Sequence, residues 1–98
     1  LETLVLKLTP SGSKSEWRDA TGSVQLIEVN LHAGWFGEAA TLIEKNTKAR
    51  LAFITRLGEA LIPDEHTVLQ EGDLIHVIAS DKEISNIEKT LAKSPDGN

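Results

Sequence analysis

Hydrophobic and polar positions divide the chain into short apolar runs that are separated by glycine, proline and polar turns. The two clearest runs lie in the second half of the sequence, at Leu51–Thr55 and Leu74–Ala79. Neither run is interrupted by acidic residues or lysine, which is typical of strands that are covered on both faces. The pattern therefore predicts two buried strands, joined by a segment that is rich in turn-forming residues.

The segment between these runs contains the signals of a hairpin and of a second turn. Leu57-Gly58 predicts a two-residue hairpin, because glycine can adopt the positive φ that such a turn requires. The return strand covers Glu59–Ile62 and ends at Pro63, since proline cannot donate a hydrogen bond to a sheet. Gly72-Asp73 is expected to form the turn before the last strand, with the aspartate bonding to neighbouring amides.

Two helices and one further strand are predicted around this segment. Val24–His32 reads as a strand whose apolar parity changes near Leu26-Ile27, so we expect either a β-bulge there or a strand that is buried on both faces at its start. Glu38–Lys45 has the apolar stripe of a first helix. A capping box at Ser80–Glu83 predicts a second helix that runs to about Leu91. These elements together indicate an α+β domain.

The two ends of the chain give weaker patterns. Leu1–Pro10 fits both a helical stripe and the alternation of a strand. Residues 11–23 contain several serines and glycines and read as a loop or linker, in which Trp17 is expected to pack on the domain as an anchor. Residues 94–98 are expected to form a tail, because their Pro-Asp-Gly sequence does not continue a helix.

Composition excludes several classes of protein. At 98 residues, with 40% hydrophobic and 26% charged residues, the chain has the size and balance of one globular domain. The absence of cysteine excludes disulfides and zinc–thiolate sites and fits a cytoplasmic location. No apolar run approaches the roughly 20 residues that cross a bilayer, so we expect no direct membrane insertion. A net charge of −5 argues against extended nucleic acid as a partner, but it still allows a small anionic ligand held by local arginines.

Motifs of catalysis are missing from the sequence. The G-x-S-x-G motif of a serine nucleophile does not occur, and neither glycine-rich phosphate loop, G-x-G-x-x-G or G-x-x-x-x-G-K-[ST], is found. We therefore expect no enzymatic activity and no resident cofactor in this chain.

An ordered set of residues is similar to that of a known family. The set comprises Gly37 with Thr41-Leu42 at the opening of a helix, Arg56 at the end of a strand, Pro63 after the hairpin, and Gly72-Asp73 before the last strand. In this order and spacing it resembles the C-terminal domain of TrkA and RCK (regulator of potassium conductance) proteins, a family of bacterial ion-transport regulators. The resemblance covers about residues 23–91.

The resemblance implies both a fold and a domain layout. The fold is a small mixed sheet of about four strands with two helices packed on it. Residues 1–22 would form an N-terminal segment and linker that includes a crossover helix, residues 23–93 the regulatory domain, and residues 94–98 the tail. The dinucleotide-binding domain that accompanies this family is not expected in the chain, because its phosphate-binding loop is missing.

The resemblance also implies a function. It is that of a ligand-sensing and dimerising regulatory domain from a cytoplasmic potassium-uptake regulator of the Trk/Ktr type. Such a protein acts on a membrane potassium transporter subunit, and its regulatory domain forms a homodimer. Cyclic di-AMP and divalent cations are the ligands that the family suggests. The alternative is a dimerisation module without its own ligand, with sensing done by a separate nucleotide-binding domain.

Arg50 and Arg56 stand at the two edges of the first buried strand and are the main candidate site residues. On residue chemistry alone, they read as solvated strand ends that pair with a nearby carboxylate such as Glu59. The resemblance adds a second interpretation, in which they hold a phosphate at a subunit junction. Under that interpretation Arg56 is the main ligand contact, and Pro63 and His66 complete the site.

The three histidines are the other candidates for metal or acid–base groups. His66 follows Asp64-Glu65 in a polar loop, where a solvated loop is favoured over a metal site because adjacent loop residues rarely converge on one ion. His76 lies within the last strand on the parity of Leu74 and Ile78. It is expected to be a hydrogen-bonded core or interface residue rather than a catalyst. His32 carries no signal.

Overall fold

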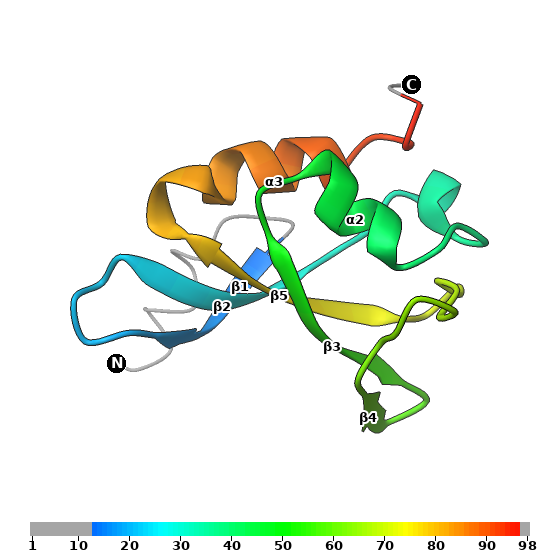
Figure 1. Ribbon diagram of the computed structural model, residues 1–98, viewed down its shortest axis with the longest axis horizontal. Helices are drawn as coiled ribbons and strands as arrows, with labels where there is room; N and C mark the ends of the chain where they lie inside the picture. The colour runs from blue at the N-terminus through cyan, green and yellow to red at the C-terminus, as the bar shows by residue number, and fades with distance from the viewer. Residues whose placement is uncertain (1–12, 97–98) are drawn as a thin grey trace, which may run out of the picture.

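In the computed structural model, which describes residues 13–96, the chain forms one five-stranded sheet with two helices on the same side of it (Figure 1). The strands are β1 (Ser13–Arg18), β2 (Val24–Val29), β3 (Arg50–Arg56), β4 (Glu59–Leu61) and β5 (Leu74–Ser80). The helices are α2 (Thr41–Asn46) and α3 (Ile84–Leu91), and two 3₁₀ turns are present, η1 (Ala33–Trp35) and η2 (Asp81–Glu83). None of the helices in the described range is both long and apolar enough to cross a membrane.

The α+β class with two helices on a small sheet is confirmed, and the sheet has five strands rather than about four and is antiparallel rather than mixed. The strand order is β1-β2-β5-β3-β4, and every neighbouring pair is antiparallel. The chain passes from β2 through α2 to β3, and these two strands point the same way. They are not neighbours, however, because β5 lies between them and is antiparallel to both. No parallel pairing therefore arises among the described strands.

The additional strand is β1, which lies in the segment that was predicted to be a loop or linker. Its sequence, SKSEWR, has no apolar alternation, because it is an edge strand that pairs only with β2. Leu1–Pro10, with its possible crossover helix, lies outside the described residues.

Strand irregularities also differ from the prediction. In β2, buried and half-buried residues alternate without interruption, so there is no bulge near Leu26-Ile27. The register shifts instead in β1, between Ser15 and Trp17, and in β3, between Leu51 and Phe53. Leu26 is half-buried on the face opposite Ile27, so β2 is fully buried on one face only, and the alternative of a strand buried on both faces at its start is not met either.

The hydrophobic core lies between the sheet and the two helices. Its fully buried large side chains come from every layer of the domain: Trp35, Ile27, Ile43, Ile54, Leu69, Ile75, Ile87, Leu91, Val29 and Val77. Trp35 closes the core beside α2, with an exposure of 0%. Its indole Nε1 donates a hydrogen bond to the Lys93 carbonyl (2.6 Å), which ties η1 to the end of α3.

Both helices begin later than the sequence predicted. The segment before α2 makes strand-like contacts, since Ala39 bridges Val68 and the Leu69 amide donates to the Glu38 carbonyl (2.9 Å). The prediction of a capping box at Ser80–Glu83 is wrong, because η2 occupies this segment and the Ser80 side chain makes no cap hydrogen bond. Helix α3 then begins at Ile84.

The turns lie where the sequence predicted them. Leu57 and Gly58 join β3 to β4 with φ values of 53° and 81°, which is the hairpin that was predicted. Gly72 has a φ of 91° in the turn before β5, where a side chain would be strained. As expected, Asp73 bonds to a neighbouring amide, because its Oδ2 accepts from the Gln70 N–H (2.9 Å).

Candidate functional site

One face of the sheet points away from the helices (Figure 1), and we call it the open face. The sequence did not predict how its side chains are arranged. Cross-strand pairing arranges the side chains in the middle of this face in three rows. The first row contains Trp17, Leu26, Ile78 and Arg50; the second contains Lys14, Glu28, His76 and Phe53; the third contains Leu74, Thr55 and Ala60. Apolar residues therefore lie on both sides of a polar central row.

Several apolar side chains of the open face are accessible to solvent. Trp17 is 52% exposed, and Leu74 and Ile78 are each 39% exposed. Leu26 and Phe53 are half-buried beside them. Trp17 was predicted to anchor a loop by packing on the domain, but it lies on an edge strand with half of its surface exposed, so that prediction is wrong. Accessible apolar side chains that are gathered on one face are a common feature of interaction surfaces.

His76 is buried at the centre of this face, although α2 and α3 both lie on the other side of the sheet. Its ring stacks on Phe53, with 4.0 Å between the ring centroids and 12° between the planes, and the residue is 4% exposed. Nδ1 lies 2.6 Å from Glu16 Oε1, and Nε2 lies 3.0 Å from Thr55 Oγ1. The prediction of a hydrogen-bonded histidine on the parity of Leu74 and Ile78 is confirmed.

Two carboxylates approach the His76 ring from the neighbouring strands. Glu28 faces His76 directly across the β2–β5 ladder. Glu16 is the extra residue at the register shift in β1, and this bulge turns its side chain toward the histidine. One ligand atom from each of Glu16, Glu28 and His76 lies within 4.8 Å of the others. We call these three residues the Glu–Glu–His cluster.

Arg56 is held in a bidentate ion pair. Its Nε and Nη2 donate to the two carboxylate oxygens of Asp73 at 2.9 and 2.8 Å, and Nη2 also donates to the Val68 carbonyl (2.9 Å). The Asp73 side chain is fully buried, and that of Arg56 is 24% exposed. The Arg56 guanidinium lowers the pKa of Asp73, and the Gln70 amide contributes in the same direction against the opposing effect of burial. The carboxylate partner is thus Asp73, not Glu59.

The four predicted ligand residues are not brought together within one chain. Arg50 and Arg56 stand at opposite ends of β3, about 20 Å apart for six residue steps in a strand. Pro63 and His66 lie in the connection between β4 and β5. His66 is exposed and is 3.4 Å from Glu65, also exposed. Its backbone amide donates to Asp64, and this lowers the pKa of the Asp64 carboxyl. The role of these four predicted residues as a ligand site stays a prediction.

Pro63 lines a small pocket of about 180 Å³ between its loop and α2. The same pocket is lined by three carboxylate residues, Glu44, Asp64 and Glu65, and by neither arginine. One of these groups is already engaged, because Glu44 Oε2 accepts a hydrogen bond from the Leu51 amide (2.8 Å). An anion at Pro63 would therefore need positive charge from outside this pocket.

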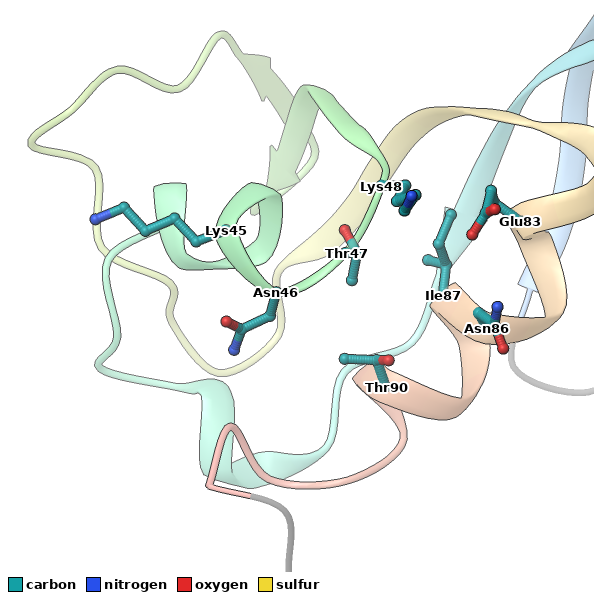
Figure 2. Close-up of a pocket in the computed structure, with 8 residues that line it drawn as sticks. All are labelled: Lys45, Asn46, Thr47, Lys48, Glu83, Asn86, Ile87 and Thr90. Carbon is teal, nitrogen blue, oxygen red and sulfur yellow. The ribbon is translucent and has the colours of Figure 1, made fainter.

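A larger pocket of about 310 Å³ lies between the end of α2 and the helix α3 (Figure 2). Lys48, Glu83, Asn86 and Thr90 are among its lining residues, so its charges are mixed. Figure 2 shows the Lys45 side chain directed away from the other labelled residues. None of the predicted site residues lines this pocket, and its chemistry does not select a ligand.

Sequence reasoning missed the Glu–Glu–His cluster. Glu28 and His76 each lay on a predicted strand, but their proximity depends on the β2–β5 register, which no local pattern reveals. Glu16 lay in the segment that was read as a loop, and it is 60 residues from His76 in the chain. The available signal was the parity of His76, which placed it on the face away from the core.

Comparisons with known proteins identify the family. The TrkA-C domain family matches residues 24–92 of the chain. The chain is 44% identical over 95 residues to the Trk system potassium uptake protein TrkA of Streptomyces coelicolor (strain ATCC BAA-471 / A3(2) / M145). This alignment includes 97% of the chain but only 43% of that relative, so the chain spans less than half of its length.

Solved structures show the same fold. The crystal structure of the GsuK RCK domain matches with a TM-score of 0.70 and 19% identity, over 87% of this chain and 19% of that one. The GsuK channel matches with a TM-score of 0.69 and 20% identity, over 87% of this chain and 16% of that one. The TrkA-C family is regulatory rather than enzymatic, in agreement with the sequence-based expectation. The resemblance inferred from the turn and strand residues is thus confirmed, and the chain belongs to the TrkA-C domain family.

Proposed function

We propose that this chain is the regulatory domain of a cytoplasmic potassium-uptake regulator, in which it pairs with a second copy and senses a small ligand. The observation that carries the proposal is the 44% identity to a potassium uptake protein over nearly the whole chain. In the full-length protein the domain would act on a membrane potassium transporter subunit. A ligand would bias the transporter only if it binds one arrangement of the paired domains more tightly than the other.

The open face supports pairing with a second copy. In a single chain it leaves Trp17, Leu74 and Ile78 accessible, while Leu26 and Phe53 extend the same apolar surface. A two-fold axis places the same patch on both partners, so each apolar row can pack against its equivalent in the other copy. Arg50, at the end of the first row, would lie at the rim of such an interface.

Cyclic di-AMP and a divalent cation are the two ligands to be tested. Two copies present two Arg56 and two Arg50 side chains, which suits a two-fold ligand with two phosphates. Two observations argue against a phosphate ligand there. Arg56 already forms an ion pair with Asp73, and the pocket at Pro63 is lined by carboxylates. Those carboxylates favour a cation at that position.

Thermal unfolding with and without each ligand tests ligand sensing. A ligand that binds the folded domain at a hundredfold excess over its Kd should raise the Tm by roughly 10 °C or more. An unchanged Tm with cyclic di-AMP and with Mg²⁺, Ca²⁺ or Mn²⁺ would leave the dimerisation module without a ligand as the better description.

Titration calorimetry with Arg50→Ala and Arg56→Lys identifies the contacts for cyclic di-AMP. Arg56→Lys keeps the positive charge beside Asp73 but cannot form the same two-point contact, so it separates ligand binding from folding better than alanine does. Loss of one charge-assisted phosphate contact should weaken binding by about 1.5–3 kcal/mol. Equal affinity in the parent and both variants would remove the arginines from the site.

A further inference from the structure

We propose that the Glu–Glu–His cluster of the open face, Glu16, Glu28 and His76, is a binding site for a divalent transition-metal ion of the Zn²⁺ class. One ligand atom from each residue already lies within 4.8 Å of the other two. A four-coordinate Zn²⁺ with bonds of about 2.0–2.2 Å holds its ligand atoms about 3.3 Å apart. The side chains would therefore need only small movements to close on the ion, and one coordination position would remain for a further ligand.

The chemistry of the three residues selects the class of metal. An imidazole nitrogen together with two carboxylates suits Zn²⁺, Co²⁺ or Ni²⁺. Ca²⁺ and Mg²⁺ prefer shells made only of oxygen, and Ca²⁺ takes six or more ligands. Since the cluster supplies one nitrogen and few oxygens, these two ions should compete poorly.

Burial and stacking hold the histidine in place for this role. The His76 side chain is only 5% exposed, and Phe53 stacks on its ring, so the ring has little freedom to rotate. Its Nδ1 is directed at the carboxylate of Glu16. The other nitrogen, Nε2, lies 3.0 Å from Thr55 Oγ1. In metal sites, the histidine nitrogen that does not bind the metal commonly has such a hydrogen-bond partner.

The proton balance is also satisfied. In neutral His76, a proton on Nδ1 donates to Glu16, and Nε2 accepts from the Thr55 hydroxyl. A metal on Nδ1 requires that nitrogen to be unprotonated. The ring proton then resides on Nε2 and donates to Thr55 Oγ1, whose hydroxyl can accept as well as donate. No proton has to leave the neutral ring, and no buried ring nitrogen loses its partner.

Hydrogen bonding does not explain why the second carboxylate, that of Glu28, lies in this cluster. Glu28 makes no hydrogen bond or ion pair through its side chain within the described part of the chain, yet it lies beside another carboxylate and is only half-exposed. Lys14 faces it across the β1–β2 ladder but forms no ion pair with it there. Two carboxylates at this distance repel each other, and a bound cation removes the repulsion.

The site is complete within one chain, so the inference does not depend on the proposed dimer or on a ligand at Arg56 and Pro63. Zn²⁺ titration of the 98-residue chain, with Zn²⁺ alone as the probe, tests it by calorimetry. We expect one ion per chain, and little competition from Ca²⁺ or Mg²⁺. Co²⁺ in place of Zn²⁺ should give the visible absorption of a four-coordinate site.

Glu28→Gln is the decisive variant, because the Glu28 side chain forms no hydrogen bond or ion pair with the described residues and its replacement should leave the fold intact. Zn²⁺ affinity should fall at least tenfold in Glu28→Gln and in Glu16→Gln. In Thr55→Val the metal-bound ring loses its outer partner, so affinity should fall severalfold with the stoichiometry unchanged. Circular dichroism confirms folding in each case.

The chain offers a matched control in its other histidine–glutamate pair, His66 and Glu65, which is exposed and lies outside the sheet. His66→Gln and Glu65→Gln should leave Zn²⁺ affinity unchanged, and Arg56→Lys should do the same. The proposal is overturned if the parent binds no Zn²⁺, if Glu28→Gln binds it as tightly as the parent, or if binding is lost in the His66 and Glu65 variants instead.

Discussion

The two faces of the sheet are built from the same strands but are covered differently. On β5, the residues that point toward the helices, Ile75, Val77 and Ala79, are at most 4% exposed, whereas Leu74 and Ile78 on the open face are each 39% exposed. His76 is the exception on the open face, where it packs against Phe53 and Glu16 rather than against α2 or α3. The covered face thus supplies the core of the fold. The open face retains the apolar surface and the polar cluster that are available to partners and ligands.

The largest expected effect contrasts one isoleucine from each face. Ile54→Ala, on the covered face at 0% exposure, should destabilise the domain by about 2–5 kcal/mol, because it leaves a cavity among fully buried side chains. Ile78→Ala should cost about 1 kcal/mol or less when measured in dilute solution, since its side chain is already partly in contact with water. Urea unfolding of both variants checks the difference, and equal losses would contradict the contrast.

The second prediction concerns the end of the covered face, where an ion pair replaces apolar contacts. Arg56 follows Ile54 by two residues and binds the fully buried Asp73. Arg56→Ala should destabilise the domain by about 2–3 kcal/mol, because the buried Asp73 carboxylate would keep only the Gln70 amide as a partner. A double-mutant cycle with Asp73→Asn measures the coupling. A coupling near zero would show that the pair does not support the fold.

The same pair predicts a dependence on pH. The folded-state pKa of Asp73 is lowered below its unfolded value of about 3.9, chiefly by Arg56. Its contribution to stability should therefore be complete above about pH 5 and be lost as pH falls through the lowered pKa. The stability difference between the parent and Asp73→Asn should shrink below about pH 4. A difference that stays constant down to pH 2 would contradict this assignment.

The smallest expected effect lies at the β3–β4 hairpin, outside both faces. Leu57 is 98% exposed and has a φ of 53°, so its side chain gains nothing from burial while its backbone is strained. Leu57→Asn should stabilise the domain by about 0.5–1 kcal/mol, because asparagine adopts this conformation more readily. A loss of stability in thermal unfolding would show that Leu57 makes a contact that outweighs the strain.

The sequence predicted those parts of the fold that depend on local chemistry. Strands β3 and β5 were visible as uninterrupted apolar runs, and the hairpin and the Gly72 turn followed from the backbone freedom of glycine. Strand β1 was missed because an edge strand with polar side chains has no apolar period to detect. The start of α2 was misplaced because Ala39 pairs with Val68, a contact that is distant in sequence.

The candidate site was harder to predict than the fold. Arg56 was singled out as a candidate ligand contact, which stays a prediction, and its ion-pair partner Asp73 was not foreseen because it lies 17 residues further along the chain. The Glu–Glu–His cluster required the register of two ladders and a bulge in β1, none of which leaves a local pattern. Sequence periodicity assigns a residue to a face, and only strand pairing determines its neighbours there.

The claim that the open face is the surface between two copies is tested most directly by the mass of the chain in solution. Light scattering at micromolar concentration should give twice the mass of one chain for the parent. Ile78→Glu, which places a charge in the first apolar row, should give the mass of one folded chain. Leu57→Glu is the matched control, because it alters an exposed leucine outside that face and should leave the dimer intact. A parent with the mass of a single chain, or an Ile78→Glu variant that stays dimeric, would contradict the account.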